Sequence, residues 1–172
     1  MIRELGCDFE TANPTAVEDE ESKDPVVRVE GNALRKARSL EGRPGYLVIG
    51  ADTVVFHDGE ILGKPGGAGK ATMMLRKLSG KHHKVYTGVT IINSDTGDEL
   101  TRHEETTVWF KELDDEAVEA YVATGEPLDK AGAYGIQGKG GALVDRIEGS
   151  YSNVVGLPLE LVREMLDKIC EQ

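Results

Sequence analysis

Apolar residues recur every three or four positions in four stretches of the chain, a spacing typical of helices with one buried face. The predicted helices cover residues 25–40, 71–78, 114–124 and 159–169. Pro25 and Asp114 suit a first helical turn. Gly80 and Gly125 suit the position directly after a helix. The sequence therefore predicts several amphipathic helices, each with one face available for a core.

Runs of β-branched and aromatic residues predict strands between these helices. The predicted strands cover residues 46–49, 54–56, 61–62, 85–92, 100–110, 133–136 and 142–147. Asp58-Gly59 lies between two of them and predicts a two-residue hairpin turn. Residues 13–24 are acidic and predict a solvated loop, and residues 149–158 predict a loop before the last helix. This mixture of helices and strands predicts an α/β or α+β fold.

Composition narrows the class of protein. The chain has 172 residues, of which 39% are hydrophobic, enough for a packed core in one domain or in two small lobes. The formal net charge is −11. An acidic surface repels a phosphate backbone, so we do not expect general binding of nucleic acid. A single nucleotide is compatible with this charge, because a few lysines in a cleft can override the overall field.

The two cysteines and the hydropathy pattern bear on location. Cys7 and Cys170 lie near opposite ends of the chain, at a spacing that fits no zinc motif, and we expect reduced structural thiols. The first residues carry no apolar signal region, and no apolar run approaches the length of a membrane span. We therefore expect a cytoplasmic protein without a membrane partner.

The segment Gly50-Ala51-Asp52-Thr53 carries the most suggestive chemistry. We expect Asp52 to follow a buried strand directly, at the edge of the sheet where open α/β folds bind ligands. A carboxylate there can hold a metal ion or deprotonate water. The alternative is a turn-forming aspartate that bonds to its own backbone.

The glycine-rich segment 63–70 superficially matches a phosphate-binding P-loop. Five residues instead of four separate Gly63 from Gly69, and Ala71 stands where the pattern needs Ser or Thr. The segment also follows a hairpin, so we do not predict a P-loop. It is either a surface loop, or Lys64 beside a rigid proline binds a phosphate as a point charge.

Other polar positions have both a structural and a functional interpretation. Lys36 lies beside the apolar face of its helix and either reaches solvent or points into a cleft. His82 and His83 are adjacent in a strand, so they point to opposite faces and are poorly placed to share a metal. Gln137, in the small-residue segment 129–138, either pairs with a base edge through its amide or bonds to backbone.

Together these segments resemble the Maf family of nucleoside triphosphate pyrophosphatases. The matching stretches occur in the family's order and span nearly the whole chain: 32–37, 49–55, 61–65, 78–82, 87–89, 121–138 and 149–159. The most specific are Ala51-Asp52-Thr53, Gly63-Lys64-Pro65 and 129–138. The resemblance implies a single Maf-like domain over residues 1–172. Its implied fold is α/β, a two-lobed mixed sheet flanked by helices around a central cleft, as in inosine triphosphate pyrophosphatases.

The resemblance also implies a reaction: water attacks the α-phosphorus of dTTP or UTP, and pyrophosphate leaves. Asp52 is the implied proton acceptor and metal contact, and Mg²⁺ or Mn²⁺ would bridge phosphate oxygens. The implied substrate contacts are Lys36, Lys64, Lys130, Thr53 and Gln137. The last two match the subgroup that prefers dTTP and UTP, because an amide and a hydroxyl can satisfy a thymine or uracil edge. A homodimer is implied as well.

One departure from the family pattern lies at the start of the sequence. Family members usually begin with a strand and a Ser-x-Ser-x-Arg-Arg loop that binds phosphate. Met1–Gly6 matches the helix after that loop, and Arg3 comes too late to be either arginine. Fewer charge-assisted bonds to phosphate would weaken binding, which motivates an alternative function, a catalytically weakened nucleotide-binding regulator. A family acidic residue matches Glu18, Asp19 or Glu20.

Overall fold

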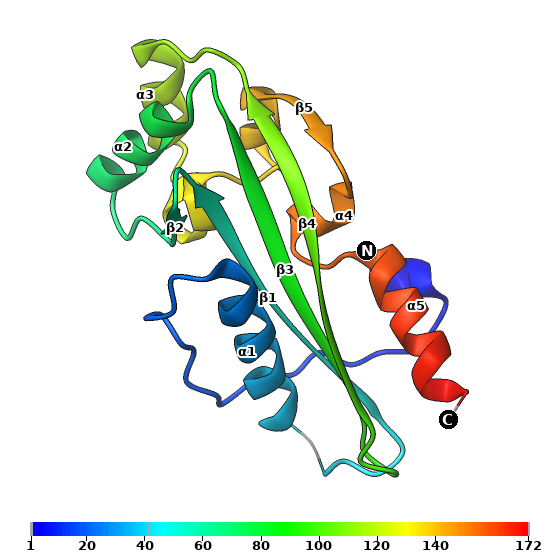
Figure 1. Cartoon of the computed structure of the whole chain (residues 1–172). Coiled ribbons are helices and arrows are strands. Elements are labelled where there is room, and N and C mark those ends of the chain that lie inside the picture. The colour runs from blue at the N-terminus through cyan, green and yellow to red at the C-terminus, as the bar shows by residue number, and fades with distance from the viewer. Residues whose placement is uncertain (1, 41, 172) are drawn as a thin grey trace. The chain divides into compact units, whose positions relative to one another are not determined.

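The computed structural model describes residues 2–40 and 42–171, and Figure 1 shows the course of the chain. The helices are α1 (Pro25–Arg38), α2 (Ala68–Leu78), α3 (Asp115–Ala123), α4 (Tyr151–Val155) and α5 (Leu159–Cys170). The strands are β1 (Leu47–His57), β2 (Glu60–Leu62), β3 (His82–Asn93), β4 (Glu99–Phe110) and β5 (Val144–Glu148). Short 3₁₀ helices cover Ile2–Leu5, Glu126–Asp129, Ala131–Ala133 and Lys139–Leu143.

The strands form one antiparallel sheet in the order β2-β1-β3-β4-β5. In the hairpin of β1 and β2, Val55 pairs with Leu62 and His57 with Glu60. The turn residues Asp58 and Gly59 have φ angles of 49° and 80°. Two successive positive φ values are the mark of a type I′ turn, so the hairpin predicted from Asp-Gly is confirmed. The α/β class with a sheet flanked by helices is confirmed as well, although the sheet is antiparallel and not mixed.

Contacts divide the chain into two compact units, and each is described by itself. The first unit comprises Met1–Thr53, Tyr86–Glu104 and Gly156–Gln172, and the second comprises Val54–Val85 and Glu105–Val155. The long strands β1, β3 and β4 contribute residues to both units. Each unit has its own hydrophobic core.

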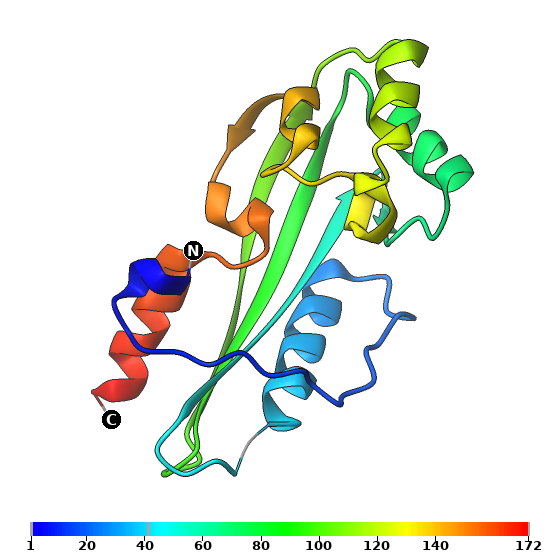
Figure 2. The ribbon, with the colours of Figure 1, turned by 180° about the vertical axis from the view of Figure 1, so that it is seen from behind.

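In the first unit, α1 and α5 lie on opposite faces of β1 and β3 (Figure 2). Successive side chains of a strand alternate between faces. Accordingly Val48 packs with α1, whereas Leu47 and Ile49 pack with α5. The same alternation in β3 places Ile92 towards α1 and Ile91 towards α5. The period of the strand therefore decides which residues of β1 face α1.

Two glycines allow α1 to approach the strands closely. A Cβ atom at Gly50 would lie 2.3 Å from the carbonyl oxygen of Ala33, and one at Gly88 would lie 2.3 Å from that of Val29. No real side chain fits at such distances, so only glycine permits this contact. The helix consequently brings its polar residues within reach of β1.

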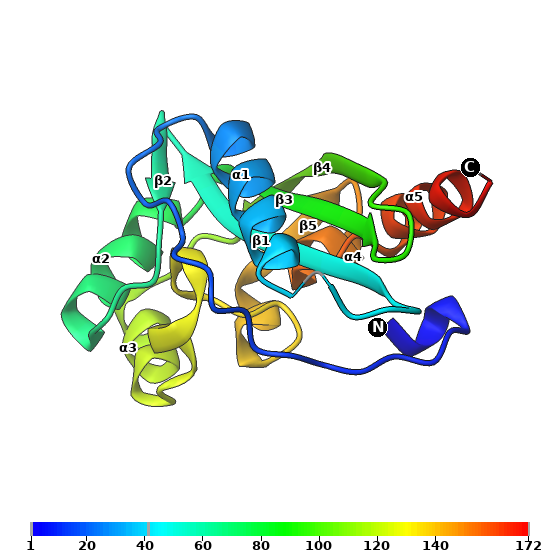
Figure 3. The same ribbon diagram turned by 90° about the horizontal axis from the view of Figure 1, so that it is seen from below.

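In the second unit, α2 and α3 lie side by side, as Figure 3 shows from below. Leu75 and Leu78 of α2 and Val118 and Tyr121 of α3 are buried in the core. α3 begins after Asp114, whose side chain accepts a hydrogen bond from the backbone N–H of Ala117, as its sequence predicts.

Two local predictions after residue 130 are wrong. Residues 133–136 do not form a strand, because Gly132 and Ala133 have φ angles of 66° and 61° and the chain turns through 3₁₀ geometry. The predicted loop 149–158 contains the short helix α4. Cys7 and Cys170 are free thiols, as expected, and both are exposed. Within residues 2–40 and 42–171, no helix is both long enough and apolar enough to cross a membrane.

Candidate active site

Asp52 lies in the middle of β1, not after its end as the sequence suggests. The strand period puts it on the face of Val48 and Gly50, towards α1. Its side chain is buried, with the residue 9% exposed. One carboxylate oxygen accepts a hydrogen bond from Lys36 Nζ at 2.6 Å, and the other accepts one from Asn32 Nδ2 at 3.1 Å. The alternative of a turn-forming aspartate is therefore wrong.

Lys36 points to the carboxylates and not to bulk solvent. Its Nζ contacts Asp52 Oδ1 at 2.6 Å, Glu18 Oε1 at 2.9 Å and the carbonyl oxygen of Ala51 at 3.2 Å. Burial alone would lower the pKa of Lys36, but its hydrogen bonds to Asp52 and Glu18 outweigh burial and raise the pKa. Lys36 is therefore a permanent cation between two acidic side chains.

Asn32, which no motif in the sequence marks as functional, joins the acidic segment to α1. It is 2% exposed. Its Oδ1 accepts a hydrogen bond from the backbone N–H of Asp19 at 2.7 Å and one from Arg35 at 3.0 Å. Its Nδ2 also donates to the carbonyl oxygen of Asp19 at 3.2 Å. The signal in the sequence was a polar residue one helical turn before Lys36, on the face that β1 covers.

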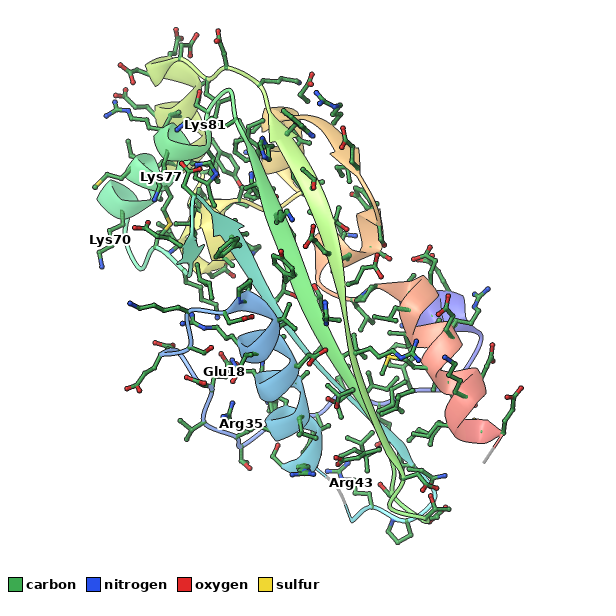
Figure 4. The ribbon with its side chains drawn as sticks, in the orientation of Figure 1. Glu18, Arg35, Arg43, Lys70, Lys77 and Lys81 are labelled. Carbon is green, nitrogen blue, oxygen red and sulfur yellow. The ribbon has the colours of Figure 1, made fainter. Side chains whose placement is uncertain are left out.

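The hydrogen bonds between Asn32 and the backbone of Asp19 also position the neighbouring Glu18. The sequence predicts a solvated segment before α1, and Figure 4 shows Glu18 there, beside the helix that bears Arg35. Asp19 Oδ1 accepts hydrogen bonds from the N–H groups of Glu21 and Ser22, which hold the pKa of Asp19 below its usual value. Because Asn32 fixes Asp19, the neighbouring Glu18 reaches Lys36. Of the three acidic residues that matched the family position, Glu18 is the one that contacts Lys36.

Thr53 faces the other side of β1 from Asp52, as adjacent residues of a strand do. Its Oγ1 lies 2.9 Å from Thr87 Oγ1 of β3, within hydrogen-bonding distance. A Cβ atom at Gly156, after α4, would lie 3.4 Å from the same oxygen. Thr53 is therefore held by β3 and is separate from the Lys36 cluster.

The remaining predicted contacts, Lys64, Lys130 and Gln137, belong to the second unit. The N–H of Gly132 donates to the carbonyl oxygen of Gly63 at 3.2 Å, which ties the segment of Lys64 to that of Lys130. Lys130 Nζ lies 2.6 Å from Asp129 Oδ1. Gln137 is exposed in a turn between Gly135 and Gly138.

The acidic groups of the first unit fit one kind of metal ion. In the part of the chain that the structure describes, no group of three or more His, Cys, Asp or Glu is placed to hold a metal. Asp52 and Glu18, however, both bring a carboxylate oxygen to the same point, the Lys36 ammonium. Mg²⁺ and Mn²⁺ prefer oxygen ligands, and Mg²⁺ commonly takes one or two carboxylates and completes its shell with water and phosphate. The two carboxylates of Asp52 and Glu18 therefore fit an ion that takes its other ligands from water and phosphate. They are too few for a metal that is bound by protein ligands alone.

Fold and cluster together define an α/β protein with a buried carboxylate that accepts hydrogen bonds from a lysine and an amide. Comparison with known proteins makes the assignment more specific. The family model described as Maf-like protein matches residues 1–169, and the chain belongs to the Maf family.

Relatives of known name cover most of the chain. A dTTP/UTP pyrophosphatase of Symbiobacterium thermophilum is 50% identical over 168 residues, which is 96% of this chain and 86% of the relative. One of Moorella thermoacetica is 49% identical over 169 residues, 96% of this chain and 87% of the relative. One of Thermococcus onnurineus is 57% identical over 130 residues, 76% of this chain and 70% of the relative.

Proposed function

We propose that this chain hydrolyses dTTP and UTP to the nucleoside monophosphate and pyrophosphate. The observation that carries the proposal is the contact of Lys36 with Asp52 at 2.6 Å, inside a cluster completed by Glu18 and Asn32. Support comes from membership of the Maf family and from relatives named dTTP/UTP pyrophosphatase that are 49–50% identical over nearly the whole chain.

In the proposed reaction, the oxygen of a water molecule forms a bond to the α-phosphorus. The bond from that phosphorus to the oxygen that bridges to the β-phosphorus breaks, and pyrophosphate leaves with the bridging oxygen. The proton of the water passes to Asp52. A carboxylate has about four lone-pair sites, and Lys36 and Asn32 occupy only one on each oxygen. Asp52 thus keeps acceptor positions for a water proton.

The lysines are proposed to bind the triphosphate. An ammonium group is a compact point charge on a flexible stem, which suits contacts to several phosphate oxygens. Lys36 is held in the charged state by Asp52 and Glu18. Lys64 and Lys130 belong to segments that a backbone hydrogen bond joins in the second unit. Gln137 and Thr53 are proposed to discriminate the base, with the Gln137 amide offering both a donor and an acceptor.

A divalent cation, Mg²⁺ or Mn²⁺, is the proposed cofactor, and Asp52 and Glu18 are the residues that would hold it. When bound, such an ion offsets the charge of the phosphate oxygens. We also propose a cytoplasmic homodimer that binds neither nucleic acid nor membrane. The net charge of −11 argues against nucleic acid. Light scattering coupled to size-exclusion chromatography tests the dimer.

The function is tested by measuring pyrophosphate release from dTTP, UTP, dCTP, ATP and GTP with Mg²⁺. We expect turnover of dTTP and UTP, and a loss of about two to four orders of magnitude in kcat for Asp52→Asn, which removes a general base. The control Asp58→Asn removes the same charge from the hairpin turn, where Asn tolerates the positive φ equally well, and it should retain activity.

The outcomes separate the possibilities. Undiminished kcat in Asp52→Asn would remove Asp52 from the role of proton acceptor. Equal loss in Asp58→Asn would point to a general charge effect. Tight binding of dTTP by the wild type without release of pyrophosphate would favour a nucleotide-binding regulator instead of the enzyme.

A further inference from the structure

The turn that presents Gln137 is a short, glycine-rich loop without a strand on either side. The N–H of Gly138 donates to the carbonyl oxygen of Gly135 at 3.2 Å, so Gln137 is the third residue of a four-residue turn. The N–H of Gly141 in turn donates to the carbonyl oxygen of Gly138 at 3.2 Å. Such local bonds alone do not fix the position of an exposed, glycine-rich loop relative to its surroundings.

Tyr121 and Glu126 fix the turn from both sides. Before the turn, the N–H of Gly135 donates to Tyr121 Oη at 3.1 Å. After the turn, the N–H groups of Lys139 and Gly140 donate to the two carboxylate oxygens of Glu126, at 3.0 and 3.1 Å. Tyr121 Oη donates to Glu126 at 2.9 Å and links the two attachments. The Glu126 carboxylate is thus an internal anion bound by successive backbone N–H groups.

The charge states suit this arrangement. Burial alone would raise the pKa of Glu126, but hydrogen bonds from Gly140, Lys139 and Tyr121 outweigh burial and lower the pKa. Burial raises the pKa of Tyr121, which therefore keeps its proton as the donor to Glu126. Hydrogen bonds to an ionised acceptor are stronger than neutral ones.

The glycines of the loop are required by the same contacts. A Cβ atom at Gly138 would lie 2.4 Å from Glu126 Oε1, and one at Gly140 would lie 2.5 Å from Tyr121 Oη. A side chain at either position would therefore displace Glu126 or Tyr121 from the contacts that hold the loop. The glycines of this turn thus lie against the Glu126 carboxylate and the Tyr121 hydroxyl, and Gln137 is an exposed side chain of the turn.

We propose that Glu126 and Tyr121 are positioning residues for base recognition, which hold the turn so that Gln137 presents its amide to the pyrimidine. The inference rests on the proposed function, in which Gln137 contacts the base of dTTP or UTP. Without the two anchors the turn is ordered only part of the time, and apparent affinity falls by that fraction. The loss should fall mainly on interactions with the base, because the proposed phosphate contacts are Lys36, Lys64 and Lys130 and not the two anchors.

The test compares Glu126→Gln and Tyr121→Phe with the wild type and with Glu119→Gln, which removes the same charge from an exposed position of α3. In Glu126→Gln, the side-chain NH₂ group would face a backbone N–H group of Lys139 or Gly140 and could not accept its hydrogen bond. We expect KM for dTTP to rise about tenfold in Glu126→Gln and Tyr121→Phe, with kcat changed less than about twofold. Inhibition by inorganic tripolyphosphate, which has no base, should be unchanged. Amide exchange of Lys139 and Gly140 should accelerate about tenfold in Glu126→Gln.

Two results would overturn the inference. Equal weakening of dTTP and tripolyphosphate would mean that the anchors only support the fold in general. Faster exchange of Lys139 and Gly140 with an unchanged KM would mean that the turn does not serve base recognition. If the wild type releases no pyrophosphate from dTTP, the proposed function has failed. Calorimetric binding of dTTP to the wild type and Glu126→Gln then decides the role of Glu126 by itself.

Discussion

His83 makes the second unit sensitive to acid, because its imidazole is enclosed by the core. The residue is 1% exposed, and its ring meets those of Phe110 and Tyr134 edge-on. Nε2 lies 2.8 Å from Tyr134 Oη. Among residues 2–40 and 42–171, Nδ1 has no hydrogen-bond partner. A protonated imidazole would carry a buried charge and an N–H without an acceptor, so folding favours the neutral form.

The magnitude follows from the pKa of His83. Burial, with smaller contributions from His57 and His82, lowers this pKa from 6.5 to about 3. Above pH 6.5 neither the folded nor the unfolded state binds the proton, and stability is fully present. Between pH 6.5 and about 3 only the unfolded state binds it, so stability falls by about 1.4 kcal/mol per pH unit. From pH 7 to 5 the loss attributable to His83 is about 2 kcal/mol.

Urea unfolding at pH 7, 6 and 5 measures this loss in the wild type, in His83→Gln and in His82→Gln. Gln cannot titrate, so His83→Gln should lose about 2 kcal/mol less than the wild type between pH 7 and 5. His82 is the matched control, because it is the exposed neighbour on the other face of β3. His82→Gln should follow the wild type closely. A pH slope of His83→Gln equal to that of the wild type would refute the reasoning.

Two further predictions concern the first unit. Gly50→Ala should lower the free energy of unfolding by about 1–3 kcal/mol, because its Cβ would lie 2.3 Å from a carbonyl oxygen of α1. Gly69→Ala, in open space within α2, should be neutral or stabilise by up to about 1 kcal/mol in the same urea experiment, and equal effects would contradict the contact. Asn32→Asp should lower kcat/KM for dTTP about tenfold at pH 7, because it removes a donor to Asp52 and places a second carboxylate beside it. An unchanged kcat/KM, or the same loss in Asn93→Asp at the end of β3, would exclude a specific role of Asn32.

Elements with strong local signals were predictable from the sequence. Asp24 caps α1 and Pro25 occupies its first turn, so the start of that helix depends on adjacent residues alone. The Asp58-Gly59 turn likewise requires only two residues that tolerate positive φ. The alternation that separates His82 from His83 is a property of any strand, and the exposed His82 and buried His83 confirm it.

The central part of β1 was not predictable because its neighbours come from elsewhere in the sequence. Gly50-Ala51-Asp52 interrupts an apolar run and so suggested the end of a strand. The strand continues because Gly50 leaves room for the backbone of α1. Lys36 and Asn32 also donate hydrogen bonds to the buried Asp52 carboxylate. Lys36 and Asn32 lie 16 and 20 residues before Asp52 in the sequence, so the residues around Asp52 do not reveal them. The predicted strand at 133–136 failed for a related reason, since distant side chains shape that loop.

Asp52 and Glu126 are both acidic side chains that the protein supplies with donors, yet the donors differ in kind. Asp52 accepts from the side chains of Lys36 and Asn32, whereas Glu126 accepts from two backbone N–H groups and Tyr121. In the proposed reaction, the Lys36 ammonium can turn from Asp52 towards a phosphate, because its stem is flexible. A backbone N–H cannot turn away without refolding the loop. Substitutions around Asp52 should therefore alter chemistry, whereas those at Glu126 should alter the shape that the substrate meets.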